Sequence, residues 1–360
     1  MIKGDGIGVD VSEAAMFLAT KAMTKAGIPA PMIVEIEAGA SYFVETGNDI
    51  QPNGEVAVGA ADAIFLGAIG LPKIRHEDGT EISPHLRLRD RYQLYAGVRP
   101  VKAYPNVPIP LADPRASKID LVIIRESTEG LFYSAAVHRR SKIINNAVCD
   151  ETLRITRATS EKLHDFAFRF ATKRKDKGHK GQVTCVDKAN VFTSMAFFRQ
   201  IFDEVGANYP DINKAYNYVD AAALDLIRIP WSADVMVMEN MFGDILSDLA
   251  GGLVGGMGMA ACGEIGDQIG LFQPAHGSAP DIMGQDKANP LAAILSARLM
   301  LDYLAEKLDQ PAYEDAAMIL DAAIETGFAL NRLRPMEIGG DMGTKAITLA
   351  LSSLMDGKLK

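Results

Sequence analysis

Cysteine is scarce in this chain of 360 residues, long apolar runs are absent, and positive charge is not in excess. The three cysteines, Cys149, Cys185 and Cys262, are far apart and odd in number, which excludes a disulfide scaffold and a CxxC zinc motif. No stretch reaches the roughly 18 apolar residues that a membrane span needs. The net charge of −9 argues against a broad surface for nucleic acid or anionic lipid. We therefore expect a cytoplasmic globular protein in which any anion site is a local cluster of Arg and Lys.

The chain exceeds the size of one small core, which predicts two domains or one large α/β domain with insertions. Four short apolar runs are typical of buried parallel strands, at residues 63–66, 121–124, 183–186 and 235–238. Segments of helical period lie between them, at residues 11–25, 151–173 and 290–307. The pair Asn289-Pro290 is a strong helix start. Alternation of strands and helices indicates an α/β fold with crossover connections.

Polar side chains directly follow the predicted strands. They are Arg125-Glu126, Asp187-Lys188, Asp220 and Glu239-Asn240. Open parallel sheets bind ligands just beyond the carboxyl ends of their strands. Charged residues at four such ends therefore predict an active-site crevice.

Two carboxylates, Asp244 and Asp248, are four residues apart shortly after the strand at 235–238. On a helix they share one face, where like charges repel by a few tenths of a kcal/mol. A hard cation such as Mg²⁺ would remove this repulsion, because one or two carboxylates commonly hold it together with substrate oxygens and water. For these two residues taken alone, a solvated acidic helix face is the alternative.

Basic residues supply candidates for anion binding and for proton transfer. Arg89, Arg99 and Arg125 carry guanidinium groups that bind carboxylates through two parallel hydrogen bonds, which suits a small polyacid. Arg125 directly follows four aliphatic residues, which favours a site over an ordinary surface position. Lys188 at a strand end could be a general base if burial lowers its pKa, and a surface ion pair with Asp187 is the alternative.

The segment His276-Gly-Ser-Ala-Pro-Asp281 combines small residues, which permit close approach of a ligand, with an Asp that could bind ribose hydroxyls. An ordinary Gly/Pro turn is the alternative. The segment Gly4-Asp-Gly-Ile-Gly8 lacks the GxGxxG spacing, and no acidic residue ends a second strand about 20 residues later. It is therefore not a dinucleotide-binding fingerprint.

Taken together, these stretches resemble the isocitrate/3-isopropylmalate dehydrogenase family. This family comprises metal-dependent β-decarboxylating 2-hydroxyacid dehydrogenases and includes homoisocitrate and tartrate/D-malate dehydrogenases. The stretches occur in family order along nearly the whole chain. They are Gly4 to Gly8, Leu94 to Pro100, Arg125 to Gly130, Val186 to Val191, Tyr218 to Asp220, Asn240 to Asp248 and His276 to Asp281.

The resemblance implies a two-domain, α/β isopropylmalate dehydrogenase-like fold, with mixed sheets flanked by helices and distinct from the Rossmann fold. Residues 1–94 and 255–360 would form the large domain with the cofactor loop. Residues 95–254 would form an inserted small domain with the substrate, metal and dimer contacts. The implied partners are a small hydroxy di- or tricarboxylate and a second copy of the chain that shares the active site, with no nucleic acid and no membrane.

The resemblance also implies a role for each candidate residue. The catalytic residues would be Lys188, Tyr133 and Asp220. The substrate-binding residues would be Arg89, Arg99, Arg125 and His85. A Mg²⁺ or Mn²⁺ ion would lie on Asp244, Asp248 and Asp220 of the partner subunit. NAD would lie on His276, Gly277, Ser278, Ala279, Asp281 and Asn289. Since an Asp on the ribose repels a 2′-phosphate, NAD is expected rather than NADP.

Two positions depart from the family pattern. The first is a Tyr that protonates the enolate, whose place is taken by Phe132, with Tyr133 next to it. The second is the loop that selects the third substituent of the substrate. There His85 and Arg87 favour a substituent bearing oxygen, whereas Ile82 and Leu86 favour an apolar one.

The resulting hypothesis is NAD-dependent oxidative decarboxylation of a 3-substituted (2R)-malate-type acid to a 2-oxo acid, CO₂ and NADH. Substrates of the isocitrate, homoisocitrate, tartrate or malate type are favoured over 3-isopropylmalate. A catalytically impaired regulatory paralogue and a metal-dependent hydrolase are two competing hypotheses.

Overall fold

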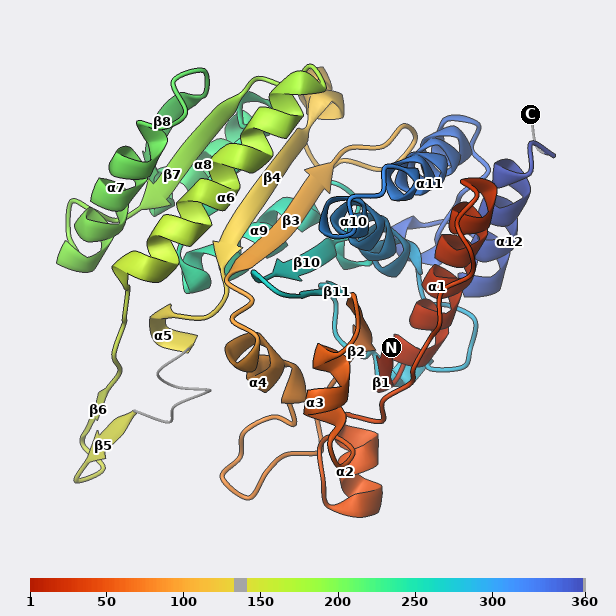
Figure 1. Cartoon of the computed structure of the whole chain (residues 1–360), viewed down its shortest axis with the longest axis horizontal. Coiled ribbons are helices and arrows are strands. Elements are labelled where there is room, and N and C mark those ends of the chain that lie inside the picture. Colours follow the sequence, from red (N-terminus) through yellow and green to blue (C-terminus); the bar gives the residue numbers. More distant parts are fainter. Residues whose placement is uncertain (133–140, 359–360) are drawn as a thin grey trace.

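The computed structural model describes residues 1–132 and 141–358, and in these residues nine strands form one mixed sheet (Figure 1). The strand order is β1-β2-β11-β10-β3-β4-β9-β7-β8. The strands are β1 (Ile2–Gly4), β2 (Ile64–Ala68), β3 (Ala96–Lys102), β4 (Asp120–Glu126), β7 (Gln182–Asp187), β8 (Asn213–Tyr218), β9 (Val235–Met238), β10 (Ala261–Ile265) and β11 (Gly270–Pro274). Parallel pairs lie at both ends, and β11, β10, β3 and β4 are antiparallel neighbours in the middle.

Helices cover the sheet, and a separate two-stranded hairpin of β5 (Lys142–Ile144) and β6 (Val148–Asp150) lies at the periphery of the molecule (Figure 1). The helices are α1 (Gly8–Lys25), α2 (Ala40–Thr46), α3 (Gly54–Gly59), α4 (Pro84–Arg91), α5 (Gly130–Phe132), α6 (Arg157–Asp176), α7 (Thr193–Gly206), α8 (Val219–Arg228), α9 (Asn240–Gly252), α10 (Leu291–Lys307), α11 (Ala312–Ala329) and α12 (Thr344–Met355). Short 3₁₀ turns include η3 (Pro230–Ser232), η4 (Met257–Met259), η5 (Pro280–Ile282) and η6 (Met336–Ile338).

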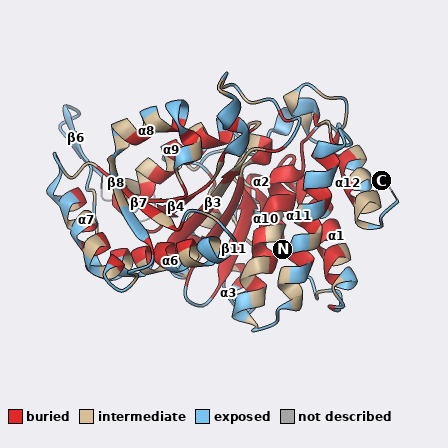
Figure 2. Ribbon diagram, turned by 90° about the horizontal axis from the view of Figure 1, so that it is seen from above, coloured by how far each residue is buried: buried red, intermediate tan, exposed pale blue. Residues whose placement is uncertain are grey.

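Strand β4 shows why the sheet has a helix layer on each face. Its side chains alternate in direction, as in any strand. Val122 and Ile124 belong to a core with α6 and α7, whereas Leu121 and Ile123 belong to a core with α8 and α9. Both faces of the strand are therefore apolar, and Figure 2 shows the buried strands between helices whose inner sides are buried. This explains why the strand is an uninterrupted aliphatic run in the sequence.

A second large core lies among α1, α10, α11 and α12. Helix α10 is its centre, because nearly all of its first eleven residues are buried. Asn289 and Pro290 precede this helix, and the side-chain oxygen of Asn289 accepts a hydrogen bond from the Leu291 amide at 3.2 Å. The predicted helix start at this position is therefore confirmed.

The structure bears out most of the predicted elements, and it corrects one boundary. The runs at 121–124, 183–186 and 235–238 lie within β4, β7 and β9. The helix predicted from residue 151 begins only at Arg157, where the Thr156 side chain caps it by accepting from the Thr159 amide. The division at 94/95 and 254/255 stays a prediction, and β10 pairs with β3 across it. Within residues 1–132 and 141–358, no helix is long and apolar enough to cross a membrane.

Candidate active site

Three buried arginines lie close to one buried carboxylate in the middle of the sheet. Arg89 is at the end of α4, Arg99 is on β3, and Arg125 is near the end of β4; all three are at most 7% exposed. Glu264 on β10 is fully buried, and its Oε1 accepts from Nη2 of Arg89 at 2.9 Å and from Nη2 of Arg99 at 3.0 Å. The predicted arginine set is thus brought together, around a carboxylate that sequence reasoning missed.

The register of three strands explains this assembly. Gly97 on β3 lies opposite Glu264 on β10 and opposite Arg125 on β4, so these residues form one row across the sheet. Arg99 is two residues along β3 and therefore points to the same face. A Cβ atom on Gly97 would lie 2.9 Å from Oε2 of Glu264 and 2.7 Å from Oγ of Ser127. Glycine at this position leaves room for the charged row.

The arginines control the charge of Glu264. Burial alone would raise the pKa of this carboxyl, but Arg89, Arg99 and Arg125 outweigh burial and lower the pKa to about 2. Burial, together with the charges of Arg99 and Arg89, lowers the pKa of Arg125 to about 10. Glu264 and Arg125 therefore both stay ionised near pH 7. Nε of Arg89 and Nε of Arg99 are buried and have no hydrogen-bond partner among the described residues.

Helix α9 brings Asp244 and Asp248 next to Arg125. The helix begins after Glu239, whose side chain caps it by accepting from the Phe242 amide at 2.7 Å. Arg125 forms an ion pair with Asp244, and it donates from Nε and Nη2 to Oδ1 of Asn240 at 3.0 and 2.7 Å. Burial and then the charge of Asp244 raise the pKa of Asp248. A cation would relieve this repulsion, so the two carboxylates suit a divalent metal ion.

Of the three predicted metal ligands, a single chain brings two, Asp244 and Asp248, together on α9. Across the part of the chain that the structure describes, no group of three His, Cys, Asp or Glu side chains is placed to hold a metal ion. Asp220, at the start of α8, instead pairs with Lys188, and this contact lowers the pKa of Asp220. Asp187, which precedes Lys188 at the end of β7, is fully buried and accepts hydrogen bonds from Nε and Nη2 of Arg199 at 2.7 and 2.8 Å. The Lys188–Asp220 pair therefore extends from an anchored strand end.

The predicted cofactor loop is tied to the N-terminal turn. The Ile7 amide donates to the Ser278 carbonyl at 2.8 Å, and a Cβ atom on Gly6 would lie 2.0 Å from the same oxygen. The side chain of Asp5 is buried and accepts from the amides of Ala40, Ser41 and Gly70. The segment Gly4 to Gly8 is thus a support for residues 276–281. This role agrees with the interpretation that the segment is not a dinucleotide fingerprint.

The residues of the cofactor loop differ in exposure. Gly277, Ala279 and Asp281 are exposed, and Ala279 has a left-handed φ of 35°. Ser278 is buried and donates to the Gly70 carbonyl. Burial lowers the pKa of His276, whose Nε2 is buried without a partner in residues 1–132 and 141–358. The loop therefore offers backbone groups and one carboxylate to solvent.

Asn289 is held by its own side-chain contacts. Its Nδ2 donates to Oε2 of Glu337 at 2.9 Å, while its Oδ1 accepts from the Leu291 amide. Oε1 of Glu337 accepts from the Gly258 amide at 2.9 Å. A bound ligand would therefore meet the backbone of Asn289 more readily than its amide group. Glu337, on η6, is a second residue near the site that sequence reasoning missed.

Only part of the predicted selectivity loop lies near the arginines. His85 is one helical turn before Arg89 on α4, and its Nδ1 is buried without a described partner. Burial and then the charge of Arg89 lower the pKa of His85 to about 3, so the ring is neutral at pH 7. Arg87 instead is exposed and pairs with Asp49 and Glu55, and Ile82 is fully buried in the protein.

Arg87 therefore lies away from the buried arginines, and the expected influence of Arg87 and Ile82 on the substrate wall stays a prediction, as does that of His85. The Arg125 guanidinium lies over the Phe132 ring, 5.1 Å from its centroid. Tyr133, the candidate acid, lies outside the described residues.

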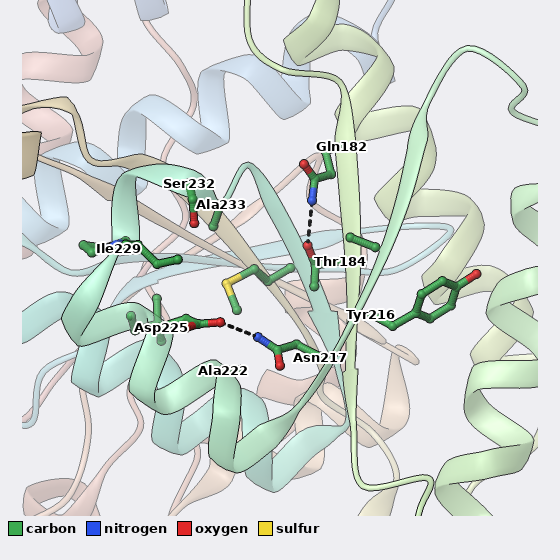
Figure 3. Close-up of a pocket in the computed structure, with 13 residues that line it drawn as sticks. Gln182, Thr184, Tyr216, Asn217, Ala222, Asp225, Ile229, Ser232 and Ala233 are labelled. Atoms are coloured by element: carbon green, nitrogen blue, oxygen red, sulfur yellow. Dashed lines mark hydrogen bonds between the residues drawn. The ribbon is translucent and has the colours of Figure 1, made fainter.

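A cavity of about 170 Å³ lies elsewhere, between the sheet edge and α8 (Figure 3). Asp225 is its one charged lining residue among those described, and its carboxylate accepts from Asn217 at 2.9 Å. Thr184, Gln182 and Ser232 are further polar lining residues. Without a cationic side chain the cavity does not suit a polycarboxylate, so the arginine set is the better substrate site.

The fold and the charged row define a class of enzyme, and comparison with known proteins identifies the family. Residues 1–351 match the isocitrate/isopropylmalate dehydrogenase family, and the chain belongs to it. It is a β-decarboxylating dehydrogenase, an oxidoreductase with the α/β fold of that family, so the predicted family and fold class are confirmed. Members of this family typically use NAD(P) and a divalent metal ion, and they bind hydroxy acids.

Relatives with different substrates are similar to this chain. It is 39% identical to 3-isopropylmalate/3-methylmalate dehydrogenase of Methanocaldococcus jannaschii, over 96% of this chain and 94% of the relative. It is 36% identical to homoisocitrate dehydrogenase of the same organism, over 100% and 98%. Among solved structures, isocitrate dehydrogenase from Methylococcus capsulatus has a TM-score of 0.83 at 29% identity, over 98% of both chains. A β-decarboxylating dehydrogenase from Thermococcus kodakarensis has a TM-score of 0.78 at 31% identity, over 99% and 95%.

Proposed function

We propose that this enzyme uses NAD to oxidise and decarboxylate a 3-substituted (2R)-malate-type acid whose third substituent bears oxygen. Substrates of this type are isocitrate, homoisocitrate, tartrate and malate. The observation that carries the proposal is the cluster of Arg99, Arg125 and Glu264 beside the carboxylates of Asp244 and Asp248. Cationic groups for carboxylates and anionic groups for a metal ion meet there at one place, as a metal-bound hydroxy acid requires.

The residues divide the chemistry among them. Arg89, Arg99 and Arg125 hold the substrate carboxylates and keep the bond to the departing CO₂ aligned. A Mg²⁺ or Mn²⁺ ion on Asp244, Asp248 and Asp220 of the partner subunit would, when bound, polarise the 2-hydroxyl and stabilise developing negative charge. Nζ of the partner's Lys188 takes the proton of the 2-hydroxyl. NAD, when bound at residues 276–281, would supply the nicotinamide that accepts the hydride from C2.

A homodimer with a shared active site is part of the proposal. Within residues 1–132 and 141–358, the β5–β6 hairpin forms no pairs with the main sheet, and its Ile143, Ile144 and Val148 are exposed. Two strands alone are marginally stable in water, so a covering partner accounts for them. Exposed Leu224 and Ile227 on α8 form a second apolar area that a dimer would bury. A cytoplasmic location stays a prediction.

Cofactor choice depends on Asp281 in this proposal. An exposed carboxylate can accept both hydroxyls of an adenosine ribose, and it repels a 2′-phosphate. We expect Asp281→Lys to lower the ratio of kcat/KM for NAD to that for NADP by about a hundredfold. Steady-state kinetics with both cofactors measure this ratio, and Asp211→Lys at another exposed position is the control. An unchanged ratio in the Asp281 variant would place the ribose elsewhere.

The third substituent is assigned through His85. Its ring is neutral, one turn from Arg89, and carries a buried nitrogen without a described partner. A neutral imidazole can hydrogen-bond to a hydroxyl or a carboxylate, whereas an isopropyl group would leave the nitrogen unsatisfied. Leu86 next to it is partly exposed, which is the observation favouring 3-isopropylmalate as the alternative substrate.

A substrate panel tests the proposed function directly. NADH formation is followed with Mn²⁺, NAD and each of isocitrate, homoisocitrate, D-malate, tartrate and 3-isopropylmalate, for the wild type and for His85→Leu. One substrate with oxygen in the third substituent should give the highest kcat/KM, and His85→Leu should shift its ratio to 3-isopropylmalate by tenfold or more toward the latter. Preference for 3-isopropylmalate in the wild type would support that substrate instead. If no substrate of the panel were turned over, the substrate would have to be another 3-substituted malate, or the protein would be a catalytically impaired paralogue.

A further inference from the structure

The charges of Arg89, Arg99 and Arg125 are unequally matched by carboxylates of the protein. Arg125 has its own partner in Asp244. Arg89 and Arg99, by contrast, share the single carboxylate of Glu264, so one positive charge of this trio is left over. All three side chains of the trio are at least nine-tenths buried, and Glu264 is fully buried. Their interaction is therefore weakly screened by water and salt.

The hydrogen bonds of the trio resemble those of a receptor that already holds an anion. A single oxygen, Oε1 of Glu264, takes one N–H from each guanidinium. Two guanidiniums bound to one carboxylate is also the arrangement expected with a ligand carboxylate. Nε of each arginine remains without a partner within the described ranges, so donor capacity is left for a ligand.

We infer that Glu264 is an internal counter-ion that stands in for a ligand carboxylate and so weakens the binding of anions at the arginine set. It is a positioning residue, because it acts through Arg89 and Arg99. Glu264 is fully buried on β10 in contact with both arginines, so it repels the carboxylate of a ligand that reaches them. When no ligand is bound, Glu264 compensates part of the positive charge of the buried Arg89 and Arg99 side chains. The inference rests on the proposed function only in taking the arginine set as a carboxylate receptor.

The opposite view, in which Glu264 only holds the arginines in position, predicts the opposite result for one substitution. Glu264→Gln removes the charge and keeps the shape. If Glu264 is a counter-ion, this variant should bind D-malate at least about tenfold more tightly than the wild type. Its Tm in buffer should be lower, because two buried cations lose their counter-ion, and adding sulfate should raise this Tm more than it raises the wild-type Tm. If Glu264 is only a scaffold, D-malate binding should weaken and sulfate should bring no extra stabilisation. The latter result would overturn the inference.

Two further variants separate charge from burial. Glu264→Asp keeps the charge, so sulfate should raise its Tm by about as much as it raises the wild-type Tm. This variant provides the test if Glu264→Gln does not fold. A clearly larger rise in Tm for Glu264→Asp would overturn the inference. Glu126→Gln is the matched control, because Glu126 is also buried but its carboxylate accepts from Thr128 and the Glu129 amide. Calorimetric titration with D-malate and melting curves in a sulfate series measure both effects. Tighter D-malate binding by Glu264→Gln would support the inference even if no panel substrate turned over, and weaker binding would overturn it even if the proposed function held.

Discussion

Replacing Lys188 by methionine is expected to lower kcat by about a thousandfold, because general acid–base catalysis contributes roughly 10²–10⁴ to a rate. The Nζ atom of Lys188 pairs with Asp220 and lies 5.9 Å from the centroid of the Tyr218 ring. Methionine has a similar length and an apolar stem but no ammonium group, so it cannot take the hydroxyl proton. The steady-state rate of NADH formation at saturating substrate measures the loss.

The same chain offers a matched control at the other end of strand β7. Lys180 lies before the strand, and its Nζ donates to the Trp231 carbonyl. Lys180→Met makes the same chemical change away from the proposed site and should leave kcat within about twofold of the wild type. Binding of NADH by both variants, followed by fluorescence, shows whether the cofactor site is intact. Full activity of Lys188→Met would remove this residue as the base.

The parts of the fold with strong local patterns could be predicted from the sequence. The runs that became β4 and β9 are buried on both faces, so their apolar character is continuous. The run in β7 is also buried on both faces, with Thr184 as its one polar residue. Strand β10 has no such signal, because it contains Gly263 and Glu264 and follows a glycine-rich stretch. Its identity as a strand depends on its antiparallel partners β3 and β11, which the local sequence does not reveal.

The candidate site was predictable to the extent that its residues stand at strand ends or at helical spacing. Glu264 was missed because its partner Arg99 is 165 residues away in the sequence. A lone carboxylate in an apolar strand is nevertheless a signal, since a buried charge needs a partner. Arg87 and Arg89 have different surroundings because residues two apart on a helix point to different sides. Arg89 therefore faces the site, while Arg87 reaches Asp49 and Glu55 at the surface.

Replacing Asp244 by asparagine tests the metal site, and we expect it to reduce Mn²⁺-dependent turnover by about a thousandfold or more. Asp244 is 44% exposed beside the buried guanidinium of Arg125, so the substitution should not disturb the core. An asparagine oxygen can still accept from Arg125, which keeps the arginine in place. The lost property is the negative charge that a divalent cation requires.

Binding of Mn²⁺ separates this effect from a general loss of activity. Titration of the protein with Mn²⁺, followed by electron paramagnetic resonance of the free ion, should show weaker binding in Asp244→Asn. Asp225→Asn on the neighbouring helix α8 is the control, because Asp225 lines the separate cavity and contacts Asn217. That variant should bind Mn²⁺ like the wild type. If Asp244→Asn kept wild-type Mn²⁺ affinity and turnover, the carboxylates of α9 would be a solvated helix face, and the ion would have to lie on other residues.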